Sequence, residues 1–209
     1  MIYNFKYSDM SRHEVSTYLE TKKFKRVLDV GAAAHGWSAK YLSHYIDINP
    51  WNNSNVKGFH GNISLYSTWK PVLEDVAING KYDFVICTHT LEDIASPQFV
   101  SEMICEIGNE GYIAVPSKNV ELSRNINGHF YGHIHHRWIF NKESDDFVAY
   151  PKLNFIEYID WTKTISKFHG FNEICFFWKD SFKLNVVNND FMGPNPGAVV
   201  SYFNGLNNE

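Results

Sequence analysis

The chain has 209 residues, of which 44% are hydrophobic, 16% aromatic and 20% charged, and this composition excludes a disordered chain. The net charge is −4, and the Lys and Arg residues are scattered, which argues against a nucleic-acid-binding surface. No apolar run approaches the roughly 20 residues of a membrane-spanning helix, and the first residues lack the apolar region of a signal peptide.

The first predicted helix covers Ser8–Lys22, because Ser11 and Glu14 have the spacing of a capping box. The apolar run Val27–Val30 follows and is typical of a strand buried on both faces. It ends in a turn of small residues from Gly31 to Gly36, which would let the backbone approach a ligand closely. Two interpretations stay open for this stretch: a nucleotide-binding turn, or an ordinary buried strand that ends in small residues.

The second predicted strand, Tyr45–Ile48, begins only nine residues after the turn, counting Gly36 to His44. A crossover between parallel strands usually needs a dozen or more residues, so the first crossover helix is predicted to be truncated. Asp47 lies at the carboxyl end of this strand. In nucleotide-binding sheets an acid at that place accepts hydrogen bonds from the ribose hydroxyls.

The middle of the chain alternates between strand and helix patterns. Its predicted elements are a strand at Val56–His60, a helix at Tyr66–Ile78 with Pro71 in its first turn, a strand at Lys81–Thr88, a helix from Ser96 to Gly108, and a strand at Gly111–Pro116. This alternation predicts an α/β fold with a doubly wound, mostly parallel sheet.

The last third of the chain begins with a long polar loop, Ser117–Arg137, which contains four histidines, and loops of this length are usually functional. The elements predicted after it are strands at Trp138–Phe140 and Phe147–Tyr150, a helix at Tyr158–Phe168, an antiparallel hairpin of Asn172–Trp178 with Ser181–Val187, and a covering loop from Asn188. We expect one domain over residues 1–209, with a core from about 25 to 187. Three widely separated cysteines, interpreted as reduced thiols, favour a cytoplasmic protein.

Several of these segments together resemble class I S-adenosylmethionine-dependent methyltransferases. They are Val27–Gly31, the acid Asp47 and the block Tyr82–Asp93. The blocks Gly111–Ser117, Gly132–Trp138 and Trp178–Phe182 are similar to one poorly characterised branch of that family. The resemblance implies a Rossmann-like methyltransferase fold with a seven-stranded sheet whose last strand is antiparallel, and it implies S-adenosylmethionine as the cofactor.

The resemblance also implies which residues bind the cofactor: the methionine part near Asp29, Gly31 and Ala32, the ribose at Asp47, the adenine between Asn62 and Ile63, and the sulfonium end near Thr88 and His89, with Ala33 and Ile48 completing the site. The chain departs from the family pattern at two of these positions. Ala33 stands where a glycine is usual, and Asn62 stands where the family has an acid.

Methyl transfer depends mainly on alignment of the nucleophile with the methyl group, and a base is needed only if the nucleophile loses a proton. The candidate catalytic residues are His89, His135 and His136, whose imidazoles titrate near neutral pH. Glu92 and Asp93 are interpreted instead as acids in the first turn of the following helix.

The cluster His133, His135 and His136 has three interpretations. Imidazoles are metal ligands, but no Cys or carboxylate lies close in sequence and the spacing fits no familiar zinc pattern. The favoured interpretation is a substrate lid without a metal, and a purely structural role also stays open.

The predicted function is a methyltransferase that acts on a small polar metabolite, such as a sugar or nucleotide-sugar. Its only expected partner is this methyl acceptor, without nucleic acid or membrane, and the oligomeric state stays open. One alternative is a catalytically inactive S-adenosylmethionine-binding or scaffold module, which the alanine-containing turn and the short crossover would suit. A nicotinamide-dependent dehydrogenase is a weaker alternative, because only Gly31 and Gly36 match the Gly-x-Gly-x-x-Gly pattern.

Overall fold

The computed structural model describes residues 10–52, 55–123, 130–143, 146–158, 172–187, 197, 200 and 201. Most of the predicted helix Tyr158–Phe168 lies outside these residues, as does most of the predicted covering loop after Asn188. Among the described residues, no helix is long and apolar enough to cross a membrane.

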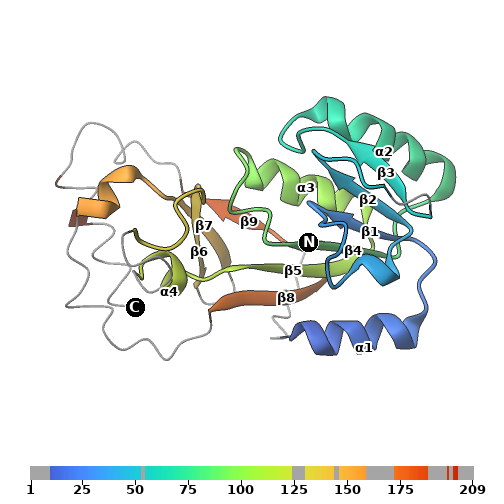
Figure 1. The fold of residues 1–209 in the computed structure, drawn as a ribbon, viewed down its shortest axis with the longest axis horizontal. Coiled ribbons are helices and arrows are strands. Elements are labelled where there is room, and N and C mark those ends of the chain that lie inside the picture. The colour runs from blue at the N-terminus through green and yellow to red at the C-terminus, as the bar shows by residue number, and fades with distance from the viewer. Residues whose placement is uncertain are drawn as a thin grey trace.

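The larger sheet has the strand order β3-β2-β1-β4-β5-β8 (Figure 1). Its strands are β1 (Val27–Val30), β2 (His44–Asp47), β3 (Lys57–His60), β4 (Phe84–Thr88), β5 (Glu110–Pro116) and β8 (Glu173–Lys179). The first five strands are parallel, and β8 is antiparallel to β5. The predicted mostly parallel, doubly wound α/β sheet with an antiparallel last strand is therefore confirmed. The predicted number of seven strands is wrong for the described residues, because this sheet has six.

A second sheet has three strands in the order β6-β7-β9. β6 (Trp138–Glu143) and β7 (Asp146–Pro151) form an antiparallel pair, and β9 (Leu184–Val186) runs parallel to β7. The predicted C-terminal hairpin is therefore wrong. β8 pairs along its whole length with the open edge of β5, which leaves the much shorter β9 to join β7.

Helices cover both faces of the larger sheet (Figure 1). α1 (Arg12–Lys22) packs on one face through Val15 and Leu19, whereas α2 (Tyr66–Asn79) and α3 (Pro97–Ile107) pack on the other. The first crossover contains only a short 3-10 helix at Ala39–Tyr41, so its predicted truncation is confirmed.

The helix ends show where local sequence rules succeed. Both hydrogen bonds of the predicted capping box at Ser11 and Glu14 are present, although α1 begins at Arg12 rather than Ser8. α3 begins at Pro97 and ends at Gly108, as predicted. The prediction for Pro71 is wrong, because Pro71 is the sixth residue of α2 and lies beyond its first turn. α2 still begins at Tyr66, since its buried indole and aliphatic side chains anchor it to the sheet.

Candidate active site

A cavity of about 260 Å³ lies at the carboxyl ends of the parallel strands, where open α/β sheets bind ligands. Its walls come from the segments that follow β1, β2, β3 and β4. The residues that line it are Gly31, Asp47, Ile48, Gly61, Asn62, Ile63, His89, Thr90, Asp93 and Ile94. The fold thus brings together six of the ten residues predicted to lie at the cofactor: Gly31, Asp47, Ile48, Asn62, Ile63 and His89.

Gly31 owes its place in this wall to its missing side chain. Its φ angle is +79°, and its N–H donates a 2.8 Å hydrogen bond to the carbonyl of Ile46 in β2. A Cβ atom at this position would lie 2.2 Å from Oγ1 of Thr90. Both the backbone conformation and the close approach of Thr90 therefore require glycine here.

The two polar residues at the ends of β2 and β3 are held by short local hydrogen bonds. Oδ1 of Asp47 accepts the N–H of Asn49 at 2.7 Å, and Oδ1 of Asn62 accepts the N–H of Ser64 at 2.9 Å. A carboxylate has about four acceptor positions, so the bond to Asn49 leaves Asp47 able to accept further hydrogen bonds. Ile48, next to Asp47, is 68% exposed and forms part of the cavity wall.

The other four predicted cofactor residues do not line the cavity: Asp29, Ala32, Ala33 and Thr88. Asp29 is buried within β1, and its Oδ2 accepts a 2.5 Å hydrogen bond from the hydroxyl of Ser38. Burial raises the pKa of Asp29 to about 7, against the hydrogen bond from Ser38, and the charge of Asp47 adds to this increase. Ala32 is buried, Ala33 is exposed, and Thr88 is half-buried at the end of β4.

A second cavity of about 380 Å³ adjoins the first, because His89 and Asp93 line both. Its lining residues are His89, Glu92, Asp93, Pro116, Val120, His133, His135, His136, Asn172 and Glu173. All three predicted catalytic histidines are among them. Residues from the β4–α3 turn, the end of β5 and the start of β8 therefore meet in one place.

His89 stands between the two cavities in a strained backbone conformation, with a φ angle of +52°. Its Nε2 lies 2.7 Å from Oε1 of Glu173 and 2.6 Å from the guanidinium of Arg12. Its Nδ1 lies 3.3 Å from Oε1 of Glu92. The carboxylate of Glu92 raises the pKa of His89 against the opposing effect of burial, and Glu173 raises it further.

Glu92 is a residue that the sequence interpretation assigned wrongly. Glu92 and Asp93 lie in the turn after β4, and α3 begins only at Pro97, so neither acid is in the first turn of that helix. Glu92 is 1% exposed, yet neither carboxylate oxygen accepts a hydrogen bond from any described residue. Its charge therefore faces His89 and the second cavity. The sequence shows only an acid close to the start of a helix, and this signal could not distinguish the turn after β4 from the first turn of α3.

The histidine segment, His133–His136, lies on the other side of this cavity. Buried charged residues hold it there. Oε1 of Glu121, which is fully buried, lies 2.7 Å from Nδ1 of His136, and Oε2 accepts a 2.6 Å hydrogen bond from the ammonium of Lys152. Burial alone would raise the pKa of Glu121, but the contacts with His136 and Lys152 outweigh it and lower the pKa below its usual value. Nothing in the polarity pattern of the predicted loop marked Glu121 as a core residue.

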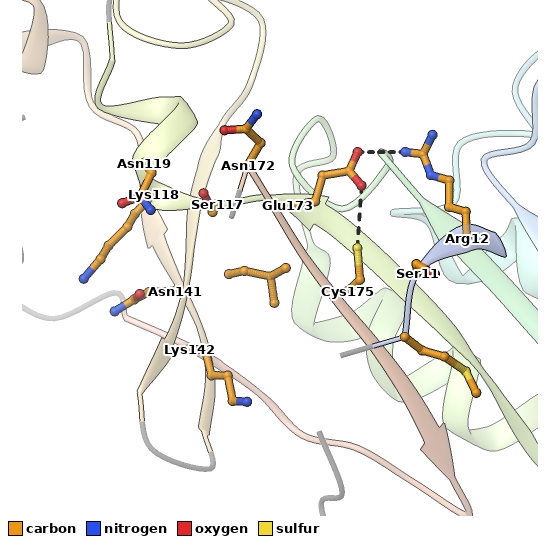
Figure 2. A pocket seen from close by; sticks show the side chains of 12 residues that line it. Ser11, Arg12, Ser117, Lys118, Asn119, Asn141, Lys142, Asn172, Glu173 and Cys175 are labelled. Carbon is orange, nitrogen blue, oxygen red and sulfur yellow. Dashed lines mark hydrogen bonds and ion pairs between the residues drawn. The ribbon is translucent and has the colours of Figure 1, made fainter. Parts of the chain in front are cut away.

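A third and larger cavity of about 820 Å³ continues from the second, since Asn172 and Glu173 line both. Figure 2 shows it between the start of α1, the end of β5, β6 and β8. The polar side chains in its wall are Ser11, Arg12, Ser117, Lys118, Asn119, Asn141, Lys142, Asn172 and Glu173. Glu173 contacts both Arg12 and Cys175 in this wall (Figure 2).

No family model and no curated protein matches the sequence. Among solved structures, the putative methyltransferase complex with the Trm112 methyltransferase activator of Haloferax volcanii is similar over 83% of this chain and 91% of the other, with 12% identity and a TM-score of 0.43. The N-terminal domain of EvdMO1, determined in the presence of S-adenosylhomocysteine and D-fucose, matches over half of each chain, with 14% identity and a TM-score of 0.37.

An S-adenosylmethionine-dependent methyltransferase of Mesorhizobium loti matches over 59% of this chain and 55% of the other, with 7% identity and a TM-score of 0.35. The chain thus spans about half the length of two of these three structures. Because these identities and TM-scores are low, the fold of the present chain is assigned from its own strand order and strand directions.

Proposed function

We propose that the protein is an S-adenosylmethionine-dependent methyltransferase. The observation that carries this proposal is the adjacency of two cavities at the carboxyl edge of the sheet, with His89 and Asp93 in the wall of both. A methyl donor in one cavity and an acceptor in the other would meet at this shared wall. Transfer between two bound molecules requires this arrangement, because the reacting atoms must be held about 3 Å apart and in line.

The smaller cavity is assigned to the cofactor. Asp47, at the end of β2, would accept hydrogen bonds from the ribose hydroxyls, while Asn62 and Ile63 flank the adenine. Gly31 would let the methionine part approach the backbone after β1. Asp29, Ala32, Ala33 and Thr88, which lie behind or beside this wall, would shape the turn rather than line the cavity.

The second cavity is assigned to the reacting end of the acceptor. The acceptor atom would attack the methyl carbon as the carbon–sulfur bond breaks, which leaves a methylated product and neutral S-adenosylhomocysteine. When the acceptor is a hydroxyl, its proton must leave, and the carboxylate of Glu92 lines the second cavity, where it can take this proton. The imidazole of His89 contacts Glu173 and Glu92 through its two nitrogens and would position Glu92 at the shared wall.

The third cavity supports a small polar metabolite, such as a sugar or nucleotide-sugar, as the acceptor. Its wall offers the amides of Asn119, Asn141 and Asn172, which can both donate to and accept from hydroxyl groups. The ammonium groups of Lys118 and Lys142 stand in the same wall and would attract a phosphate. A volume of about 820 Å³ is in the range of pockets that bind small molecules.

Calorimetry and a transfer assay test the proposal together. The protein is titrated with S-adenosylmethionine and S-adenosylhomocysteine, and we expect dissociation constants on the order of micromolar. It is then incubated with methyl-labelled cofactor and a fractionated metabolite extract, where we expect a labelled small molecule and equimolar S-adenosylhomocysteine.

Folded protein that binds neither cofactor form would overturn the proposal. Binding without turnover on any fraction would favour the alternative of an inactive cofactor-binding module, which the truncated first crossover also suits.

A further inference from the structure

Three histidines that are separate from the proposed cofactor contacts gather at one point of the second cavity. One ring nitrogen of each of His133, His135 and His136 lies within 4.8 Å of the others. The fold also supplies the carboxylate that the local sequence lacks. Oδ1 of Asp93, from the β4–α3 turn, lies 3.8 Å from Nε2 of His135 and 3.8 Å from Nε2 of His136.

Hydrogen bonds fix the backbone that carries these side chains. The N–H of Arg137 donates to the carbonyl of Glu92 at 2.6 Å, and the indole of Trp138 donates to the carbonyl of Ile94 at 2.8 Å. These two bonds hold the histidine segment directly against the turn that contains Asp93. The ammonium of Lys152 donates to the carbonyl of His133 at 2.7 Å, which fixes the other end of the segment.

His136 is oriented as histidine ligands of metals commonly are. Its Nδ1 lies 2.7 Å from the buried carboxylate of Glu121, so its Nε2 is left to face Asp93 and the other two imidazoles. A carboxylate behind an imidazole fixes the tautomer that presents a free nitrogen and makes that nitrogen more basic. Two buried residues, Lys152 and Glu121, therefore fix the position of the His136 imidazole.

The charge around the cluster points to a cation. Glu92 lines the same cavity, and both of its buried oxygens lack a hydrogen bond from the described residues. The imidazole of His89, 3.3 Å from Oε1, partly offsets this charge, and a bound cation would offset it further. Asp93 adds a second carboxylate at the same place.

We propose that His133, His135, His136 and Asp93 bind one divalent first-row transition metal ion. Three imidazoles and one carboxylate are a donor set that suits zinc, manganese, iron or cobalt in the divalent state. Adjacent ligand atoms around such an ion lie roughly 3.3 Å apart for bonds of about 2.0 Å. The separations of the three imidazole nitrogens, which reach 4.8 Å, would therefore need to shorten by up to about 1.5 Å. An expanded coordination shell would leave a position for an oxygen atom of the methyl acceptor.

The role of the ion rests on the proposed function, whereas its binding does not. An acceptor hydroxyl bound to the ion would have a lowered pKa, because the metal stabilises the negative oxygen. With the ion and the methyl donor bound, the hydroxyl proton would pass to a neighbouring carboxylate such as Glu92, the oxygen would attack the methyl carbon, and the carbon–sulfur bond would break toward sulfur. The ion would keep its oxidation state, so the step would need no oxidant or reductant.

Metal titration of the full chain tests the site without reference to activity. The protein is treated with a chelator, dialysed, and titrated with Co²⁺ by absorption spectroscopy and with Zn²⁺ by calorimetry. We expect one ion per chain, with visible absorption bands for bound cobalt. His135→Ala and Asp93→Asn should each weaken binding at least tenfold. The side chains of His135 and Asp93 are 63% and 42% exposed, so neither substitution removes a core residue.

His13→Ala is the matched control, because His13 is an exposed imidazole on α1 that lines none of the three cavities. It should bind the metal as the unchanged protein does. Absence of binding, or equal affinity in the His135→Ala, Asp93→Asn and His13→Ala variants, would overturn the metal site.

Titration with S-adenosylhomocysteine in the same samples separates the two proposals. Loss of metal binding with retained cofactor binding overturns the metal site alone. Metal binding without cofactor binding supports the metal site and contradicts the proposed function instead.

Discussion

The two sides of the shared wall at His89 are built in different ways. On the side that we propose binds the cofactor (the cofactor side), the lining residues follow the ends of consecutive parallel strands, so the backbone of the sheet positions them. On the side that we propose binds the methyl acceptor (the acceptor side), the residues that line the second cavity come from the β4–α3 turn, the end of β5, the histidine segment and the start of β8. The larger sheet positions three of these four segments but not the histidine segment, which precedes β6 of the second sheet. The backbone of the sheet thus organises one side, whereas the other side also needs the contacts that hold the histidine segment.

The interactions that fix each side differ accordingly. The cofactor side depends on Gly31 and Gly61, whose φ angles are +79° and +146° and whose missing side chains admit Thr90 and Thr68. The acceptor side depends on the contact chain from Lys152 through Glu121 to His136. Substitution of these glycines should therefore destabilise the protein through backbone and steric strain. Substitution in the chain of contacts should destabilise it by leaving a buried charge unpaired.

The largest expected effect concerns that contact chain. Lys152→Met keeps much of the side-chain volume but leaves the Glu121 carboxylate, which is fully buried, without its cation. Removal of one partner from a buried ion pair costs about 3–5 kcal/mol, so urea denaturation should show a loss of that size in the free energy of unfolding.

Lys40→Met is the control for this change, because Lys40 pairs with Glu20 on the surface. Solvent screens that pair, so its removal should leave the unfolding midpoint almost unchanged. Similar losses in the two variants would show that the acceptor side does not depend on its buried charges.

The next largest expected loss of stability concerns the backbone on the cofactor side. Gly31→Ala places a methyl group 2.2 Å from Oγ1 of Thr90 at a positive φ angle. The left-handed conformation costs about 1–2 kcal/mol for a residue with a Cβ, and the steric overlap adds about 1–3 kcal/mol. Thermal unfolding should report the sum of these two costs.

Gly80→Ala separates the two costs. Gly80 has a φ angle of +81°, but no atom lies within 4 Å of where its Cβ would be. The ψ angle of Gly80 is 172°, so it lies in a region that is nearly restricted to glycine, and the variant should lose only about 1–3 kcal/mol of conformational strain. Equal losses at Gly31 and Gly80 would show that the close packing of Thr90 is unimportant.

A smaller effect concerns ligand affinity on the same side. Asp47→Ala removes the acid proposed to hold the ribose, and hydrogen bonds to a charged group are worth about 1.5–3 kcal/mol. The affinity for S-adenosylhomocysteine should therefore fall roughly 10- to 100-fold by calorimetry. Asp146→Ala, at an exposed position of β7, should bind normally. Unchanged affinity in Asp47→Ala would contradict the proposed placement of the ribose.

The contrast between the two sides also explains what the sequence could predict. Asp47 was found from a local pattern, because a residue at the end of a parallel strand must lie at the ligand-binding edge of the sheet, whereas Asn62 followed from the resemblance to the methyltransferase family. The short crossover before β2 followed from chain length alone. Both rules use only neighbouring residues in the sequence.

The acceptor side could not be predicted in that way. The alternating pattern of the C-terminal strands indicates two strands but does not specify their partners, so β8 and β9 were paired with each other. The proximity of Asp93 to His135 and His136 depends on contacts about 40 residues apart in the chain. The burial of Glu121 depends on Lys152, a cation in a separate element.

The smallest expected effect concerns Asp29, which lies behind the cofactor cavity. Its pKa rises from 3.8 to about 7, chiefly because burial disfavours the charged carboxylate. The folded protein therefore binds this proton more tightly than the unfolded chain does. The resulting stability is present below about pH 4 and is lost as the pH rises through about 7. Asp29→Asn cannot ionise, so relative to the unchanged protein it should gain about 1 kcal/mol or more between pH 5 and pH 8.

Urea unfolding at both pH values measures that gain, and Asp75→Asn is the matched comparison. Asp75 is also buried, but hydrogen bonds from Lys57, Arg26 and Tyr82 outweigh its burial and lower its pKa. Its contribution has the opposite sign, because ionised Asp75 stabilises the fold above about pH 4 and loses this effect in acid. Asp75→Asn should therefore destabilise the protein at both pH values. An Asp29→Asn variant with the same relative stability at pH 5 and pH 8 would show that Asp29 is already ionised in the fold.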